Sequence, residues 1–137
     1  NVRAAYLLAQ TLAPGMIARG WGRVVNVSSQ SALVALPDHL AYCASKGALE
    51  MMSKVMALEW APKGLTVNCI APTVINTPMA AMAFPSEEDK ARMLAQIPVG
   101  RFGEVEEVAR LACFLASQDA AMITGDTIRL DGGWTLR

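Results

Sequence analysis

Short apolar segments alternate with helical patterns along most of this 137-residue chain. Continuous apolar segments rich in β-branched residues are typical of strands buried on both faces of a parallel sheet, and they occur at 23–28, 65–70 and 127–130. Apolar residues at three- and four-residue spacing predict helices over 1–19, from Leu40 to about Glu59, and over 105–117. The pattern therefore predicts strands that are separated by helices.

Helix breakers and turn residues mark where these elements end. Pro14-Gly15 lies inside the first helical pattern and is expected to kink or divide that helix. The second helix is followed by Pro62 and Gly64, which together predict its end. The segment 79–95 reads as partly helical from Ser86, whose hydroxyl suits the cap of a helix with an acidic first turn. Loops or turns are expected at 71–78, 98–103 and 131–133.

Strands that alternate with helices predict right-handed crossovers and a parallel sheet. The expected fold class is therefore α/β: a Rossmann-like, doubly wound parallel sheet in three αβα layers. Residues 1–137 form a single domain in this interpretation, but three strands make a narrow sheet that is expected to need partners. The chain also begins at Asn1, without methionine, inside a helical pattern. We expect it to be the C-terminal part of a larger fold.

Composition limits the possible partners more than it identifies one. The formal net charge of zero gives no electrostatic case for binding nucleic acid or an anionic membrane, and no apolar run reaches the ~18 residues that span a bilayer. With one histidine, and no C-x-x-C pair among Cys43, Cys69 and Cys113, no metal site is expected. Cys69 and Cys113 lie in apolar segments, so we expect them to be buried and reduced, in a cytoplasmic setting.

Three side chains that could carry chemistry lie at the end of the first strand and at the start of the second helix. Tyr42 and Lys46 are four residues apart at the start of that helix, so the phenol and the ammonium share one face. An isolated phenol titrates near pH ~10, and a neighbouring cation favours the phenolate form. Such a pair can give or take a proton at an alcohol or ketone carbon. Ser29 closes the first strand, where the crevice of an open α/β sheet lies.

A tyrosine and a lysine at this spacing more often form only an amphipathic helix surface. The order of residues favours chemistry, because Ser29, Tyr42 and Ser45-Lys46 resemble the Ser…Tyr-x-x-x-Lys signature of the short-chain dehydrogenases/reductases. The resemblance implies that Tyr42 is the general acid/base and that Ser29 bonds the reacting oxygen. Lys46 would hold the nicotinamide ribose. Asn1 matches the helix asparagine of the family's catalytic tetrad and would position a water in the proton relay.

The family usually follows the second strand with Pro-Gly-x-x-x-Thr, which contacts the nicotinamide end of the cofactor. Here the segment reads Pro72-Thr73-Val74-Ile75-Asn76-Thr77, with threonine in place of glycine. By the resemblance, the cofactor-binding residues are Tyr42, Lys46, Pro72, Thr73, Ile75 and Thr77, and the cofactor is NADP or NAD. The Pro-Thr-Val form resembles the subgroup that contains L-xylulose (dicarbonyl) reductase and related sugar-alcohol dehydrogenases.

The family's glycine-rich phosphate turn has no counterpart in this chain. Gly20-Trp21-Gly22 precedes a strand rather than joining a strand to a helix, so it is not equivalent to that turn. The resemblance extends from Asn1 to the turn at 131–133. It implies that the N-terminal phosphate-binding part is absent, and we expect these 137 residues alone to be inactive.

The expected substrate contacts are Ser29, His39 and Tyr42. His39 precedes Tyr42 on a loop, where a histidine is either a substrate contact or a neutral, hydrogen-bonded neighbour. Met79, Met82 and Phe84 lie on the segment that closes over substrate in this family, which suits a flexible lid, but ordinary packing explains them as well. These alternatives stay open at this point.

The sequence is thus interpreted as the catalytic part of an NAD(P)-dependent oxidoreductase that interconverts a secondary alcohol and a ketone. The substrate would be a small molecule: a sugar alcohol, a ketose or a small dicarbonyl. The alternative is a non-catalytic half-domain that serves as a folding or oligomerisation partner. The family likeness also implies a homo-oligomer, a tetramer with the first and second helices at an interface.

Overall fold

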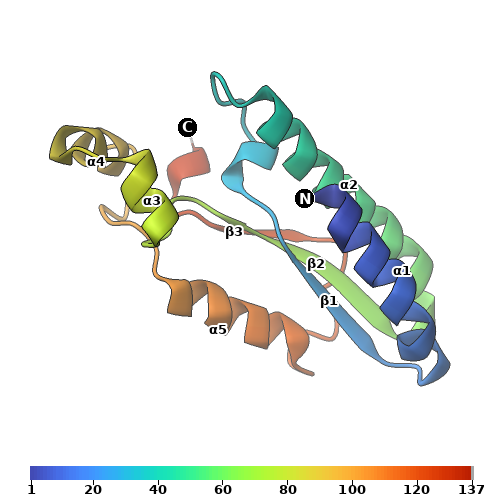
Figure 1. The fold of residues 1–137 in the computed structure, drawn as a ribbon. Helices are drawn as coiled ribbons and strands as arrows, with labels where there is room; N and C mark the ends of the chain where they lie inside the picture. Colours follow the sequence, from blue (N-terminus) through green and yellow to red (C-terminus); the bar gives the residue numbers. More distant parts are fainter. Residues whose placement is uncertain (137) are drawn as a thin grey trace.

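The computed structural model describes residues 1–136, and its centre is a three-stranded parallel sheet with the strand order β1-β2-β3 (Figure 1). The strands are β1 (Gly22–Val27), β2 (Leu65–Pro72) and β3 (Thr127–Leu130). The helices are α1 (Val2–Ala18), α2 (Leu40–Trp60), α3 (Pro78–Ala83), α4 (Glu87–Leu94) and α5 (Val105–Ala116). Single 3₁₀ turns form η1 (Gln30–Ala32), η2 (Ala61–Lys63) and η3 (Trp134–Leu136).

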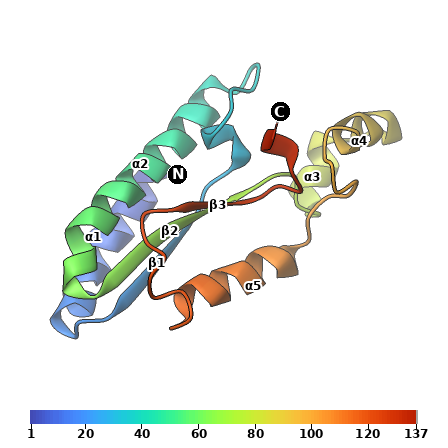
Figure 2. The ribbon, with the colours of Figure 1, turned by 180° about the vertical axis from the view of Figure 1, so that it is seen from behind.

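Helices cover both faces of the sheet. α1 and α2 pack on one face, in a core that contains Ala9, Met56 and Val67. α5 packs on the other face, in a core that contains Ile70 and Leu115. Figure 2 shows the same arrangement from behind, with the sheet between the two helical layers. The predicted α/β class, with a doubly wound parallel sheet in three layers, is confirmed.

The carboxyl ends of the three strands meet at one edge of the sheet. Val27 of β1 pairs with Ile70 of β2, and Pro72 of β2 pairs with Leu130 of β3. Ligands of open α/β sheets bind outside this edge, and the residues that follow β1 and β2 start from it. Every residue of β2, the central strand, is buried. β1 is only partly buried because it is an outer strand of the sheet that residues 1–136 form, with a neighbouring strand on one side only. The prediction that β1 is buried on both faces is therefore wrong.

The two crossovers of the sheet differ in hand. The chain steps in the same direction from β1 to β2 and from β2 to β3, yet α2 and α5 lie on opposite faces (Figures 1 and 2). Two such connections have opposite hands, so the prediction of right-handed crossovers holds for only one of them. Connections between parallel strands of one sheet are right-handed in about 98% of cases, so one of these two connections is a rare exception.

Tertiary packing overrides part of each of two local predictions. Pro14 does not divide α1, which continues from Val2 to Ala18. Ala9 and Ala13 are buried on the turns before it. Cys69 is buried as predicted, but Cys113 is exposed, because only one side of α5 packs against the sheet. Within residues 1–136, no helix is both long and apolar enough to cross a membrane.

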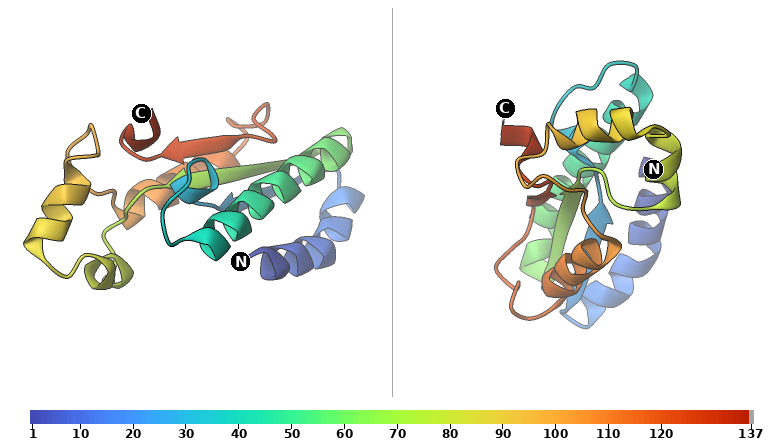
Figure 3. Two further views of the ribbon diagram at one scale, coloured as in Figure 1. Left: turned by 90° about the horizontal axis from the view of Figure 1, so that it is seen from above. Right: turned by 90° about the vertical axis from the view of Figure 1, so that its left-hand side faces the viewer.

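α3 and α4 project from the carboxyl edge of the sheet, away from the other elements (Figure 3). The predicted cap of α4 is confirmed, because the Ser86 hydroxyl accepts a hydrogen bond from the Asp89 N–H at 3.0 Å. α3 was not predicted. Thr77 caps it by accepting a hydrogen bond from the Ala80 N–H at 3.3 Å, and Pro78 occupies its first turn. A capping threonine followed by proline is a helix-start signal, but two prolines within 71–78 favour a loop there in the sequence pattern.

Candidate active site

Tyr42 and Lys46 project from the first turns of α2 at the carboxyl edge of the sheet. The Lys46 Nζ lies 5.8 Å from the centre of the Tyr42 ring, so the two groups share one face of the helix as their spacing predicts. The same Nζ donates a hydrogen bond to the Val27 carbonyl oxygen at 2.8 Å. This bond ties α2 to the end of β1. The Tyr42 side chain remains accessible, because 42% of the residue is exposed.

The Lys46 ammonium lies in a setting that disfavours its charge. Burial lowers the pKa of Lys46 below its ordinary value, and the neighbouring Cys69 only partly opposes this shift. An ammonium has three donors, and the Val27 carbonyl takes one of them. The other two are left for a ligand, and a bound hydroxyl would replace part of the lost hydration.

Ser29 follows β1 and caps η1. Its Oγ accepts hydrogen bonds from the backbone N–H of Ser31 at 3.2 Å and from the Ser31 hydroxyl at 2.8 Å. Capping alone explains a serine at this position. The two accepted bonds also occupy the oxygen lone pairs, so the Ser29 proton is the part of the hydroxyl left to donate to another group.

A cavity of about 430 Å³ brings most of the predicted site residues together. Ser29, Tyr42 and Lys46 line one part of it. The segment after β2 lines another part with Pro72, Thr73, Ile75 and Thr77. Met79, Ala80, Ala83 and Phe84 line the part contributed by α3 and its end. The contributions of Ala80 and Ala83 were not predicted, since recognising them requires recognising α3.

The backbone of Ile75 is oriented by a bridge to Gly103. The Gly103 N–H donates to the Val74 carbonyl at 3.0 Å, and the Asn76 N–H donates to the Gly103 carbonyl at 2.8 Å. In a bridge bonded through the residues on either side, the N–H and C=O of the central residue point away from the partner. The N–H and C=O of Ile75 therefore point away from Gly103, and both are available to bind a ligand.

Thr73 and Thr77 make different contacts, although both line the cavity. The Thr73 Oγ1 is buried and has no hydrogen-bond partner within residues 1–136. A buried hydroxyl without a partner carries a desolvation cost that a bound polar group would relieve. The Thr77 Oγ1 is engaged in capping α3, so it couples the cavity wall to that helix.

Asn1 and His39 lie outside this cavity. The Asn1 Nδ2 donates to the Ser45 Oγ at 2.9 Å, and this hydroxyl donates to the Tyr42 carbonyl at 2.8 Å. Asn1 thus contacts α2 at Ser45 and is linked to the Tyr42 backbone through that serine. His39 precedes α2 and is exposed, and its Nδ1 lies 2.6 Å from the Pro37 carbonyl oxygen. Its Nε2 is the ring nitrogen that remains for another contact.

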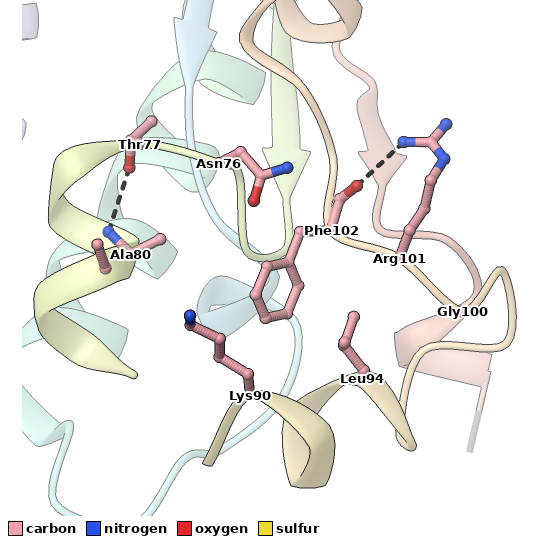
Figure 4. A pocket seen from close by; sticks show the side chains of 9 residues that line it. Asn76, Thr77, Ala80, Lys90, Leu94, Gly100, Arg101 and Phe102 are labelled. Atoms are coloured by element: carbon pink, nitrogen blue, oxygen red, sulfur yellow. Dashed lines mark hydrogen bonds between the residues drawn. The ribbon is translucent and has the colours of Figure 1, made fainter. Parts of the chain in front are cut away.

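A second cavity, of about 440 Å³, lies between α3, α4 and the loop before α5 (Figure 4). It shares Thr77 and Ala80 with the first cavity. Its cationic side chains are already paired, because Lys90 contacts Glu87 at 2.6 Å and Arg101 contacts Glu107 at 2.6 Å. No acid/base pair like that of the first cavity lines it. The first cavity is therefore the candidate active site.

Comparison with known proteins agrees with the fold. A family model described as enoyl-(acyl carrier protein) reductase matches residues 1–135. The NAD-dependent glycerol dehydrogenase of Listeria innocua is 45% identical over 139 residues, which cover 100% of this chain and 54% of that protein. The L-xylulose reductase of Mus musculus is 46% identical over 135 residues, which cover 98% of this chain and 55% of that protein.

A solved structure matches over the same part of the chain. The gluconate 5-dehydrogenase from Burkholderia cenocepacia J2315, in complex with NADP and tartrate, gives a TM-score of 0.92 and 34% identity over 97% of this chain and 52% of that one. The chain belongs to the short-chain dehydrogenase/reductase family. It spans about half the length of the curated relatives it matches. The predicted likeness to the L-xylulose reductase and sugar-alcohol dehydrogenase subgroup is confirmed.

Proposed function

We propose that this chain is the catalytic part of an NAD(P)-dependent oxidoreductase that interconverts a secondary alcohol and a ketone. The observation that carries the proposal is the convergence of Ser29, Tyr42 and Lys46 on one cavity at the carboxyl edge of the sheet. A proton donor and acceptor, a second hydroxyl and an ammonium are the groups that this reaction needs at its reacting carbon and its cofactor ribose.

The cavity fits the nicotinamide end of NAD or NADP. Lys46 offers free ammonium donors for ribose hydroxyls, and Ile75 directs both of its peptide groups away from its bridge partner, where they can meet a carboxamide. The unpartnered Thr73 hydroxyl supplies a further polar group at the same wall. The bound cofactor would supply or accept the hydride. These residues, with Pro72, Thr77 and Tyr42, are the proposed cofactor contacts.

Each residue of the site has its own role in the proposed reaction. Tyr42 gives a proton to the carbonyl oxygen in reduction and takes it back in oxidation. Ser29 donates its hydroxyl proton to the same oxygen and holds it beside the phenol. Lys46 fixes the ribose on the face of α2 that carries Tyr42. Asn1, bonded to Ser45 on that helix, positions a water that carries the proton toward solvent, and His39 contacts the substrate at the mouth.

The relatives and the cavity support the proposed substrate class. Proteins named glycerol dehydrogenase, L-xylulose reductase and gluconate 5-dehydrogenase are similar to this chain, and they support a sugar alcohol, a ketose or a small dicarbonyl as the substrate. The polar residues of the cavity, together with the apolar Met79 and Phe84, suit a short hydroxylated chain. Either NAD or NADP serves as cofactor in this proposal.

The complete protein would add the N-terminal phosphate-binding half and assemble as a homo-oligomer, a tetramer in the cytoplasm. Support for assembly comes from apolar side chains that α1 and α2 expose: Leu8, Leu12, Met51, Val55 and Leu58. Large exposed apolar patches mark interaction sites. Light scattering of the complete gene product gives a tetramer mass if this surface is an interface, and a monomer mass contradicts it.

The function is tested with the complete gene product and nicotinamide absorbance. Ketoses and small dicarbonyls should be reduced, and sugar alcohols oxidised, with either NADP or NAD. An enoyl thioester, included because of the family model's description, should not be turned over. Absence of nicotinamide-dependent turnover together with absence of cofactor binding favours the alternative, a non-catalytic half-domain that serves as a folding or oligomerisation partner.

A further inference from the structure

A line of polar contacts joins β1 to α2 next to the candidate active site, whose cavity Ser28 also lines. The Asn26 Nδ2 donates to the Ser53 Oγ at 2.8 Å, and the Ser28 Oγ donates to the Glu50 Oε1 at 2.7 Å. Asn26 and Ser28 are two residues apart on β1 and its continuation, so they share one face of the strand. Their partners on α2 are one turn apart, and α2 runs antiparallel to β1 in this pairing. We call these two contacts the β1–α2 seam.

Glu50 is the unusual member of the seam. Only 6% of Glu50 and 3% of Ser28 are exposed. Removing a carboxylate from water is costly, and an apolar side chain of similar volume is often neutral or stabilising at a buried site. A carboxylate that accepts a short hydrogen bond from a hydroxyl instead supplies a strong and directional contact. Stability alone therefore gives no reason for a glutamate here, whereas alignment of two elements does.

The position of the contact links it to the chemistry. Ser28 directly precedes Ser29, and its own N–H donates to the Ile70 carbonyl at 2.7 Å, which anchors it to β2. Glu50 is four residues beyond Lys46, one turn along the same helix. Any slide of α2 along β1 moves the phenol and ammonium relative to the serine hydroxyl, and the Ser28–Glu50 bond opposes that slide.

We propose that Glu50 is a positioning residue, which holds Ser28 and thereby sets the distance between Ser29 and the Tyr42–Lys46 face of α2. The inference rests on the proposed function. A displacement of about 1 Å at a reacting group lowers turnover by about a hundredfold. Loss of the Ser28–Glu50 bond should therefore reduce kcat far more than it reduces the folded fraction.

The test compares variants of the complete gene product. Glu50→Leu removes the acceptor at similar volume, Ser28→Ala removes the donor, and Glu50→Gln keeps an acceptor oxygen. Met56→Ala is the matched control, because Met56 is also buried on α2 but lies outside the seam. kcat, KM and the thermal midpoint are measured for each variant.

Glu50→Leu and Ser28→Ala should each lower kcat by about ten- to a hundredfold, and the double variant should lose little more. Glu50→Gln should restore most of kcat. Met56→Ala should lower the thermal midpoint at least as much as Glu50→Leu does, but it should keep kcat within about twofold of the wild type. Ser28→Ala, a small change, keeps the test informative if Glu50→Leu does not fold.

The positioning role is overturned if Glu50→Leu or Ser28→Ala keeps full kcat, or if the kcat losses of all variants follow their thermal midpoints. Tyr42→Phe is measured beside them. When Tyr42→Phe loses turnover and the seam variants do not, the positioning role fails while the proposed function stands. When Tyr42→Phe keeps turnover, the proposed function itself fails.

Discussion

Lys46 on α2 donates a hydrogen bond to the carbonyl oxygen of Val27, the last residue of β1, at 2.8 Å. This contact joins the helix that carries Tyr42 to the strand that Ser29 follows. It also orients the ammonium at the cavity edge, with donors left for a ribose. One side chain therefore joins α2 to β1, and in the proposed function it also binds the cofactor ribose.

Replacing Lys46 should weaken the cofactor complex. In Lys46→Met, loss of charge-assisted hydrogen bonds worth about 1.5–3 kcal/mol should raise the Kd for NAD(P) by about ten- to a hundredfold. Fluorescence titration of the complete gene product measures it. Lys54→Met, two turns along the same helix and outside the cavity, is the control and should bind as the wild type does. Equal Kd values for the wild type and Lys46→Met would contradict a role of Lys46 in binding the cofactor.

Much of the site could be predicted because local rules place its residues. A continuous apolar strand puts Ser29 at the carboxyl edge of the sheet, and helical spacing puts Tyr42 and Lys46 on one face. The contact of Lys46 with Val27, and that of Ser28 with Glu50, could not be predicted. Both depend on the position of α2 along β1, which cannot be derived from the spacing of residues in the sequence.

Burial could be predicted only where the whole element is covered. Cys69 and Cys113 both lie in apolar segments, but Cys69 is on β2, which is covered on both faces, and its pKa is raised by burial, with the Ser53 hydrogen bond opposing the shift. Cys113 is on α5, whose outer side is free of the sheet. Which side of a helix faces the sheet follows from tertiary packing, as does the continuation of α1 through Pro14.

The cap of α3 should matter for cofactor binding. In Thr77→Val, the lost hydrogen bond to the Ala80 N–H costs about 1 kcal/mol of helix stability, so α3 frays and the Kd for NAD(P) rises. Thr77→Ser keeps the capping oxygen and should bind normally. Ser86→Ala removes the cap of α4, whose residues do not line the cavity. An equal rise of Kd in Ser86→Ala would show that general fraying, not the cavity wall, is responsible.

Gly64 should be the glycine least tolerant of a side chain among those with positive φ. At φ 87°, a Cβ on Gly64 would lie 2.0 Å from the Gly20 carbonyl oxygen. Gly20 has φ 66° but nothing within 4 Å of its Cβ position. Gly20→Ala should therefore cost only the left-handed strain of about 1–2 kcal/mol, and Gly64→Ala clearly more, in urea unfolding of the complete protein. Equal costs would mean that the contact between the two turns is absent.

The ion pair of Arg101 and Glu107 fastens the loop before α5, next to the Gly103 that bridges Ile75. Hydrogen bonds from Arg101 and from the Glu104 N–H lower the pKa of Glu107 to about 2, from an ordinary 4.5. A carboxylate with a lowered pKa stabilises the fold above its unfolded pKa and loses that effect as the pH falls through its folded pKa.

The thermal midpoint of Glu107→Gln should therefore lie below that of the wild type at pH 6. The difference should shrink as the pH falls from about 4.5 toward 2. Glu106→Gln is the matched control, because Glu106 is its neighbour on α5 and forms no ion pair in the described part of the chain. A difference that stays constant down to pH 2 would contradict the pKa assignment.

Turnover of Tyr42→Phe in the complete gene product is the most direct measure of the central claim. Positioned proton transfer contributes about 10²–10⁴-fold to rate, so kcat should fall by at least about a hundredfold. The Kd for NAD(P) should stay close to that of the wild type. Tyr6→Phe, an exposed tyrosine on α1, should leave kcat unchanged. A Tyr42→Phe variant that retains wild-type kcat would contradict the assignment of this cavity as an active site.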